Sequence, residues 1–157
     1  MGVQLTKEQR EAVENRGGSL LVSAAAGSGK TKVLVERLFR YLTDPAHPAD
    51  VTDFLIITYT KAAAAELKMK IAAELSERLA EDADNVHLQK QALLIYRADV
   101  RTVDSFCTNL LRENIHLVGG GDCPLTPDFR VLDEQEASLL RAQVLERVLE
   151  EFYGAMK

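Results

Sequence analysis

The feature that most constrains the fold of this chain is a glycine-containing octapeptide between a short apolar run and an amphipathic segment. The apolar run covers residues 19–23 and has the length of a β-strand. The octapeptide, residues 24–31, reads Ala-Ala-Ala-Gly-Ser-Gly-Lys-Thr. Apolar side chains then recur at helical spacing from Val33 to Leu42. A strand, a glycine loop that ends in Gly-Lys-Thr, and a helix in this order predict a phosphate-binding P-loop.

The residues of the octapeptide have separate physical roles. Gly27 and Gly29 allow a tight curl in which backbone N–H groups converge on an anion, and the next helix adds the positive end of its dipole. We expect Lys30 to reach the β and γ phosphates of ATP and the Thr31 hydroxyl to ligate Mg²⁺, which makes these two the catalytic residues. Ala24 replaces the first glycine of the general pattern, which a residue with φ below zero permits. The predicted nucleotide-binding residues of the loop are Ala24, Ala25, Ala26, Gly27, Ser28, Gly29, Lys30 and Thr31. The alternative is a glycine-rich turn that ends in Lys-Thr by coincidence.

A glutamine lies shortly before the first strand and has two interpretations. Thr6 is expected to cap a short helix over residues 7–13, and Gln9 stands three residues later, where a capping box places it. The functional alternative is that the Gln9 carboxamide turns to the nucleotide base. With one acceptor and two donors it could read both N6 and N7 of adenine and so select ATP over GTP.

A second apolar run, residues 54–60, predicts a strand that continues directly into a helix. Because the run is nearly all apolar, we expect a parallel strand that is covered on both faces. The helix carries an i, i+4 stripe made of Leu67, Ile71, Leu75 and Leu79. Residues 81–85 predict a loop, and the helix after it is expected to pack through Leu88, Ala92, Leu93 and Ile95.

Hydroxyl groups and a cation gather where this second strand ends. Thr58, Thr60 and Lys61 occupy its carboxyl end, beside a helix N-terminus. Ligands of open α/β sheets bind at this edge. Thr60 on its own could simply be a helix N-cap. With a P-loop one unit earlier in the chain, we favour a contact with the phosphate backbone of a nucleic acid.

A third short strand is predicted at residues 100–104, and a further helix follows it. Ser105 and Phe106 lie at the junction. Phe106 either stacks on a nucleic-acid base or fills the core, and the two interpretations carry similar weight. Asp104 is expected to cap the helix with its carboxylate.

The C-terminal part begins with a glycine-rich stretch, residues 119–124, that predicts a flexible joint. A long helix then carries apolar residues at Leu140, Val144, Leu145, Val148, Leu149 and Phe152. The pair Asp133-Glu134 has the letters of the acidic site that ATPases use for Mg²⁺ and the attacking water. The preceding residues make a poor strand, so we interpret Asp133 as the helix N-cap and Glu136 as its capping-box partner.

Composition restricts the classes of function. At 157 residues with 46% hydrophobic residues the chain fits one domain with a real core. The net charge of −5 excludes nucleic-acid binding by bulk electrostatics, so any such contact must be local. Cys107 and Cys123 have no metal-site spacing, which is typical of a reducing cytoplasmic environment. Neither a membrane-spanning run nor a signal-peptide pattern is present.

Four segments together resemble the N-terminal part of the superfamily 1 DNA helicases of the UvrD/Rep group. Residues 5–13 look like the Q motif of that family, 24–31 like motif I, 57–67 like motif Ia and 102–106 like motif Ib. The triple alanine before Gly27 and the Ser-Phe-Cys at residues 105–107 are more similar to the AddA-type subunits of helicase–nucleases. RecB-type subunits are similar too, and helicases of the UvrD/PcrA type, which lack a nuclease, are the nearest alternative.

The resemblance implies a fold and a function. The implied fold class is α/β: a partial P-loop NTPase domain of RecA-like fold at residues 1–118, with parallel strands and flanking helices. Residues 119–157 would hold a linker strand and the first helix of an inserted helical subdomain. The implied cofactors are ATP and Mg²⁺, with Gln9 on adenine. DNA would contact Thr58, Thr60, Lys61, Ser105 and Phe106.

The implied whole protein is larger than this chain. It would act in double-strand-break repair, translocate on single-stranded DNA and pair with a second, AddB-like subunit, and an exonuclease is expected. This chain alone is expected to bind ATP and to hydrolyse it poorly. Two departures from the family pattern are Lys61-Ala62, where Asn-Lys is usual, and Asp104, where a histidine is usual. The alternatives of another class are a P-loop small-molecule kinase, with Arg97 and Arg101 as acceptor ligands, and a non-catalytic nucleotide-binding module.

Overall fold

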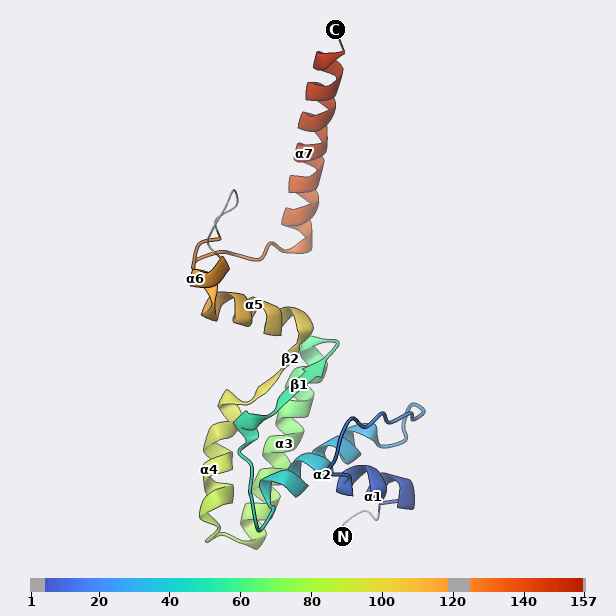
Figure 1. Cartoon of the computed structure of the whole chain (residues 1–157), viewed down its shortest axis with the longest axis vertical. Coiled ribbons are helices and arrows are strands. Elements are labelled where there is room, and N and C mark those ends of the chain that lie inside the picture. The colour runs from blue at the N-terminus through green and yellow to red at the C-terminus, as the bar shows by residue number, and fades with distance from the viewer. Residues whose placement is uncertain (1–4, 119–124, 157) are drawn as a thin grey trace. The chain divides into compact units, whose positions relative to one another are not determined.

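The computed structural model describes residues 5–118 and 125–156, and these fall into two compact units. Unit 1 is Met1–Thr108 and unit 2 is Asn109–Lys157. The elements of unit 1 are α1 (Lys7–Glu14), α2 (Lys30–Leu42), the 3-10 helix η1 (Val51–Asp53), β1 (Leu55–Thr58), α3 (Lys61–Glu81), α4 (Val86–Leu94), the 3-10 helix η2 (Ile95–Arg97) and β2 (Asp99–Thr102) (Figure 1). Helix α5 (Val103–Glu113) begins in unit 1 and ends in unit 2.

The sheet of unit 1 is a parallel pair in which the two strands start and end together. Leu55 of β1 lies opposite Asp99 of β2, and Thr58 lies opposite Thr102. A parallel pair with flanking helices confirms the α/β class. The expectation that β1 is covered on both faces is wrong, because Leu55 and Ile57 are 49% and 41% exposed while Ile56 between them packs against the core. Alternate side chains of a strand point to opposite faces, so the helices of unit 1 cover one face of β1.

The main core of unit 1 lies among α2, α3, α4 and the segments that flank the strands. Its most deeply buried side chains are Phe39, Leu42, Val51, Ile71, Leu75 and Gln91. The predicted stripe of α3 is confirmed, with Leu67, Ile71 and Leu75 buried and Leu79 packed against them. Leu88 and Ile95 are also buried, but Leu93 is 77% exposed, so its predicted place in the core is wrong. The buried face of α4 follows the i, i+3, i+7 spacing from Leu88, and Leu93 lies off that stripe.

A smaller cluster joins α1 to α2. Ala12 and Val13 of α1 are buried against Val33 of α2. The Arg37 guanidinium donates a hydrogen bond of 2.5 Å to the Ala12 carbonyl oxygen. Together these contacts fix the N-terminal helix beside the helix that follows the octapeptide.

The strand predicted at residues 19–23 does not form. These described residues have no regular secondary structure, and Leu21 is 94% exposed. Figure 1 shows the connection between α1 and α2 as an extended loop. A strand needs a neighbour that satisfies its backbone groups, and β1 in unit 1 pairs with β2 instead. Leu20 and Val22 still contact α2 from one side, where they line a hollow with Val33 and Leu34.

The third predicted strand is shorter than expected at its end. β2 stops at Thr102, and Asp104 lies inside the first turn of α5. The predicted capping role of Asp104 is therefore wrong. The Thr102 hydroxyl oxygen takes this role, since it accepts a hydrogen bond of 3.2 Å from the Ser105 N–H.

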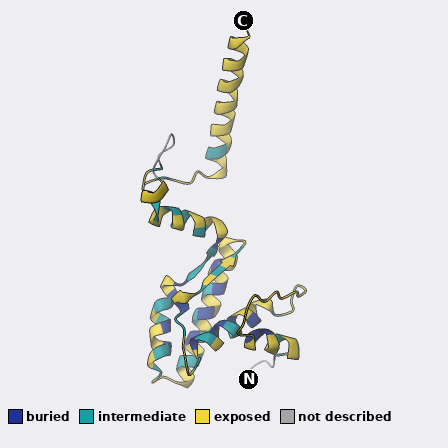
Figure 2. Ribbon diagram, viewed as in Figure 1, coloured by how far each residue is buried: buried dark blue, intermediate teal, exposed yellow. Residues whose placement is uncertain are grey.

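Unit 2 contains the end of α5, the short helix α6 (Ile115–Val118) and the long helix α7 (Glu134–Ala155). Asp133 and Glu136 form the predicted capping box of α7. The expected linker strand is not seen in residues 125–133, which have no regular structure, and the predicted joint at residues 119–124 lies outside the described residues. The apolar side chains of α7 are exposed along its length (Figure 2). None of the described helices is long and apolar enough to cross a membrane.

Candidate functional site

The octapeptide forms a tight turn at the start of α2. Gly27 and Gly29 adopt φ values of 76° and 81°, in the left-handed region where a side chain is strained. Between them, the Ser28 N–H and hydroxyl both donate to the Ala25 carbonyl oxygen, at 3.3 and 2.7 Å. The two glycines are therefore required by the backbone, as the sequence predicted.

The side chain of Lys30 folds back onto this turn. Its ammonium donates to the carbonyl oxygens of Ala24 and Ala25, at 2.8 and 2.7 Å. Lys30 is the first residue of α2 and is exposed to solvent. A phosphate that binds here must therefore replace two carbonyl acceptors of the lysine with its own oxygens.

Gln9 contacts both its own helix and the octapeptide. Its Oε1 accepts a hydrogen bond of 2.9 Å from the Thr6 N–H, and the Thr6 hydroxyl accepts from the Gln9 N–H in return. This arrangement confirms the predicted capping box. In addition, Nε2 donates to the Ser28 carbonyl oxygen at 3.0 Å. The carboxamide keeps one lone pair and one N–H hydrogen for a further partner.

These groups line one hollow of about 460 Å³, which we call the loop hollow. Gln9 and Glu8 of α1 lie on one side and Lys30 and Val33 of α2 on another, and the remaining lining residues are Thr6, Ala12, Val22, Ser23, Ala24 and Ser28. The structure therefore brings together Gln9, Ala24, Ser28 and Lys30 from the predicted set. Ser23 and Val22 were missed, because the sequence places them in a strand rather than in a wall of the site.

Thr31 lines a different hollow, between α2 and α3. That hollow measures about 340 Å³ and also contains Glu36, Lys70 and Glu74. The Thr31 side chain is exposed at the first turn of α2. Among the residues that the structure describes, no group of three His, Cys, Asp or Glu side chains is placed to hold a metal ion.

One carboxylate of the loop hollow has a perturbed pKa. Glu8 accepts a hydrogen bond from its own backbone N–H and a second one from the Thr6 hydroxyl, and these lower the pKa of its carboxyl group. Glu8 is therefore ionised at neutral pH. It places a negative charge at the α1 side of the hollow, opposite in sign to Lys30.

The second predicted site lies at the carboxyl edge of the parallel pair. The Thr60 hydroxyl caps α3 by accepting from the Ala63 N–H at 3.1 Å, and the Thr58 hydroxyl donates to the Thr60 carbonyl oxygen. Lys61 is the first residue of α3 and is exposed. Because Thr58 lies opposite Thr102, the strand register brings the two predicted DNA-binding segments to the same edge.

The segment after β2 contributes less open groups to this edge. The Ser105 hydroxyl oxygen accepts a hydrogen bond of 3.1 Å from the Thr102 hydroxyl. Phe106 is half-buried in α5. Thr58, Thr60 and Lys61 thus present the more accessible part of the edge.

Comparison with known proteins identifies the family. The model of the UvrD/REP helicase N-terminal domain matches residues 5–155 of the chain. The chain belongs to the UvrD/REP helicase family. The family match includes the octapeptide, Gln9 and both segments at the carboxyl edge of the sheet.

Several curated relatives of this UvrD/REP chain share one name. A protein of Pelotomaculum thermopropionicum is 47% identical over 150 residues, which are 96% of this chain and 11% of the relative. One of Desulfitobacterium hafniense is 48% identical over 95% of this chain and 10% of the relative, and one of Clostridium novyi is 42% identical over 96% and 12%. Each is named as the A-type component of an ATP-dependent helicase/nuclease, so the resemblance to AddA-type subunits is confirmed. The chain spans about a tenth of the length of these relatives.

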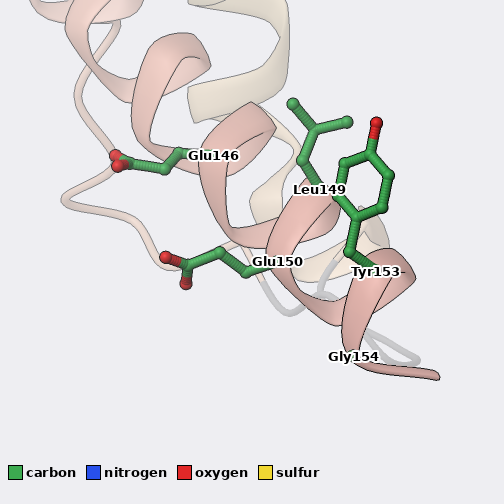
Figure 3. Close-up of a pocket in the computed structure, with 5 residues that line it drawn as sticks. All are labelled: Glu146, Leu149, Glu150, Tyr153 and Gly154. Carbon is green, nitrogen blue, oxygen red and sulfur yellow. The ribbon is translucent and has the colours of Figure 1, made fainter. Parts of the chain in front are cut away.

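A further hollow of this UvrD/REP chain lies on α7 and is not a candidate site. Figure 3 shows its lining residues, Glu146, Leu149, Glu150, Tyr153 and Gly154. All five come from one face and end of a single helix. Since a binding site encloses its ligand between elements, this surface offers no comparable constellation of groups.

Proposed function

We propose that this chain is the ATP-binding part of an ATP-dependent DNA helicase, in which residues 24–31 act as the P-loop of a RecA-like NTPase domain. The observation that carries the proposal is the loop hollow. There one carboxamide, one lysine and a left-handed glycine turn come together from two helices and a loop. Family membership adds independent support, because the relatives are named for ATP-dependent helicase action.

The nucleotide would occupy the loop hollow with its base toward α1. Gln9 retains one acceptor site and one donor hydrogen, which match N6–H and N7 of adenine. Lys30 would exchange the Ala24 and Ala25 oxygens for those of the β and γ phosphates. The backbone from Ala26 to Thr31 would surround the phosphates at the positive end of the α2 dipole.

Mg²⁺ fits the chemistry of these residues. The Thr31 hydroxyl is exposed at the first turn of α2, and oxygen ligands combined with phosphate oxygens suit this cation. When bound, Mg²⁺ would neutralise charge on the phosphates. Thr31 would hold the cation, and Lys30 would orient the terminal phosphate.

Single-stranded DNA would bind at the carboxyl edge of the parallel pair. Thr58, Thr60 and Lys61 offer hydroxyls and a cation there, and Ser105 and Phe106 follow the neighbouring strand. The net charge of −5 requires this contact to be local. Two sites on one α/β unit would let ATP turnover alter the grip on DNA, which is what translocation needs.

The whole protein would be an AddA-type subunit that works in double-strand-break repair. It would carry an exonuclease and pair with an AddB-like second subunit. This chain alone should bind ATP and turn it over slowly. The P-loop holds the phosphates, but a fast phosphoryl transfer also needs groups that stabilise the transition-state charge and position the attacking water.

The experiment that tests the proposal measures the affinity of this chain for Mg·ATP with and without an oligodeoxythymidine. We expect Mg·ATP to bind and to change the affinity for the oligonucleotide, with slow hydrolysis in both cases. Since coupling between two ligands is reciprocal, the oligonucleotide must change the affinity for ATP by the same factor. ATP binding without any coupling to DNA would contradict the helicase part of the proposal, and transfer of phosphate to a small hydroxyl compound would favour a kinase.

A further inference from the structure

Gln9 is the residue through which α1 contacts the octapeptide turn. The side chain is partly buried, and its two polar atoms have separate partners that lie 3 and 19 residues away in the chain. The near partner belongs to the N-cap of α1. The distant partner, the Ser28 carbonyl oxygen, lies between the two glycines with positive φ.

The two partners fix the orientation of the carboxamide. The Thr6 N–H is only a donor, so it requires Oε1, and the Ser28 carbonyl oxygen is only an acceptor, so it requires Nε2. A flipped amide would lose both hydrogen bonds. The position of Ser28 is therefore tied to the N-terminus of α1, which is itself held by Ala12 and Val13 against α2.

The same amide also limits how closely the turn can approach α1. A Cβ added at Gly29 would lie 3.3 Å from Gln9 Nε2, whereas one added at Gly27 would meet nothing within 4 Å. Gly29 is the N-cap of α2, and Lys30 follows it. Gln9 thus contacts the turn at the point where the phosphate-binding backbone enters the helix.

We infer that Gln9 is a positioning residue for the phosphate-binding turn, independent of any contact with the nucleotide base. The inference rests on the proposed function, since it assumes that residues 24–31 bind phosphate. In this role the carboxamide holds Ser28 and Gly29 at the height at which their backbone receives an anion. Loss of the contact would weaken the binding of phosphate ligands that carry no base.

The test uses Mg·tripolyphosphate, a ligand without base or sugar, and two variants with opposite side effects. Gln9→Glu keeps an acceptor for the capping box, since Glu is a usual residue at that position, but it cannot donate to Ser28 and adds a negative charge. Gln9→Met removes the donor without adding charge, but it weakens the cap. Only the loss of the contact with Ser28 is common to both variants.

A matched control exists in unit 1. Gln89 of α4 also donates through Nε2 to a backbone carbonyl oxygen, that of Ala83 at 2.7 Å, on an exposed surface away from the loop hollow. Gln89→Glu therefore makes the same chemical change at the same kind of contact. Thermal unfolding of each variant shows whether the fold is retained.

We expect both Gln9 variants to bind Mg·tripolyphosphate about fivefold more weakly or worse, as the loss of one net hydrogen bond predicts. Gln89→Glu should bind it as the unmodified chain does, and Gln9→Glu should unfold at an unchanged temperature. Two results would overturn the inference. One is weaker ATP binding with unchanged tripolyphosphate binding, which leaves Gln9 as a base contact alone and the proposed function intact. The other is an effect of Gln9→Glu without one of Gln9→Met, which assigns the loss to charge. If the unmodified chain binds neither ATP nor tripolyphosphate, the proposed function fails, and the inference fails with it.

Discussion

Replacing Gln91 by methionine should destabilise unit 1, because this side chain is fully buried and polar. Its Oε1 accepts from the Val51 N–H at 2.8 Å, and its Nε2 donates to an Asp50 carboxylate oxygen at 2.6 Å. Val51 lies in η1, directly before β1, and is 1% exposed. The two hydrogen bonds therefore join α4 to the segment that leads into the sheet.

The size of the effect follows from what the substitution leaves behind. Methionine has a similar length but no donor or acceptor of comparable strength, so the buried Val51 N–H loses its partner at a cost of about 1–3 kcal/mol. Asp50 keeps its contact with Lys90 and remains partly exposed, so water compensates for most of its loss. We expect a net loss of about 2 kcal/mol in the free energy of unfolding, or about 8 °C in the melting temperature.

Urea denaturation followed by circular dichroism measures this loss, and Gln89→Met is the matched control. Gln89 lies on the same helix, is exposed and makes one side-chain hydrogen bond to the Ala83 carbonyl oxygen. Its replacement should change the stability by less than about 0.5 kcal/mol. Equal losses in the two variants would refute the reasoning, because burial of the Gln91 network would then have no energetic consequence.

Three other predictions concern the two sites and the same polar network. Lys61→Ala should weaken the binding of an oligodeoxythymidine and lower the salt slope of its logarithm of affinity by about 0.7, as measured by fluorescence anisotropy; an unchanged slope would remove Lys61 from the interface. Gly29→Ala should reduce Mg·ATP affinity more than Gly27→Ala in a calorimetric titration, because both add strain but only the first contacts Gln9; the opposite order would contradict the described turn. The hydrogen bond from Lys90, and then that from Gln91, lowers the pKa of Asp50. The ionised carboxylate therefore adds stability above its unfolded pKa of about 3.9 and loses it as pH falls through the lower folded value. The stability deficit of Asp50→Asn seen at pH 7 by urea denaturation should disappear in acid, and a deficit that persists there would contradict this assignment.

Local signals were the most predictable part of the fold. The caps formed by Thr6, Thr60 and Asp133 depend on a partner three residues away, so the sequence contains all the information they need. The long helices and the buried stripe of α3 follow from side-chain periodicity in the same way. The acidic pair at Asp133 was correctly separated from a metal site on this basis.

Pairing partners and distant polar contacts were not predictable from these signals. The apolar run at residues 19–23 has the composition of a strand, but a strand forms only where another strand receives its backbone groups. Gln91 was not expected in the core, because its partners Val51 and Asp50 lie 40 and 41 residues earlier. The contact from Gln9 to Ser28 was missed for the same reason, although both residues were assigned to the nucleotide site.

The central claim is that residues 24–31 bind the phosphates of ATP, and calorimetric titration of Mg·ATP into this chain and its Lys30→Ala variant tests it most directly. Lys30 would exchange two carbonyl contacts for contacts with charged phosphate oxygens. The account predicts binding to the unmodified chain and a loss of about 3 kcal/mol or more in the variant, or at least about 100-fold in affinity. The variant should retain the circular dichroism spectrum of the unmodified chain, since α2 packs through Val33, Leu38 and Leu42 rather than through Lys30. Equal affinities in two folded proteins would contradict the P-loop assignment and the helicase function that depends on it.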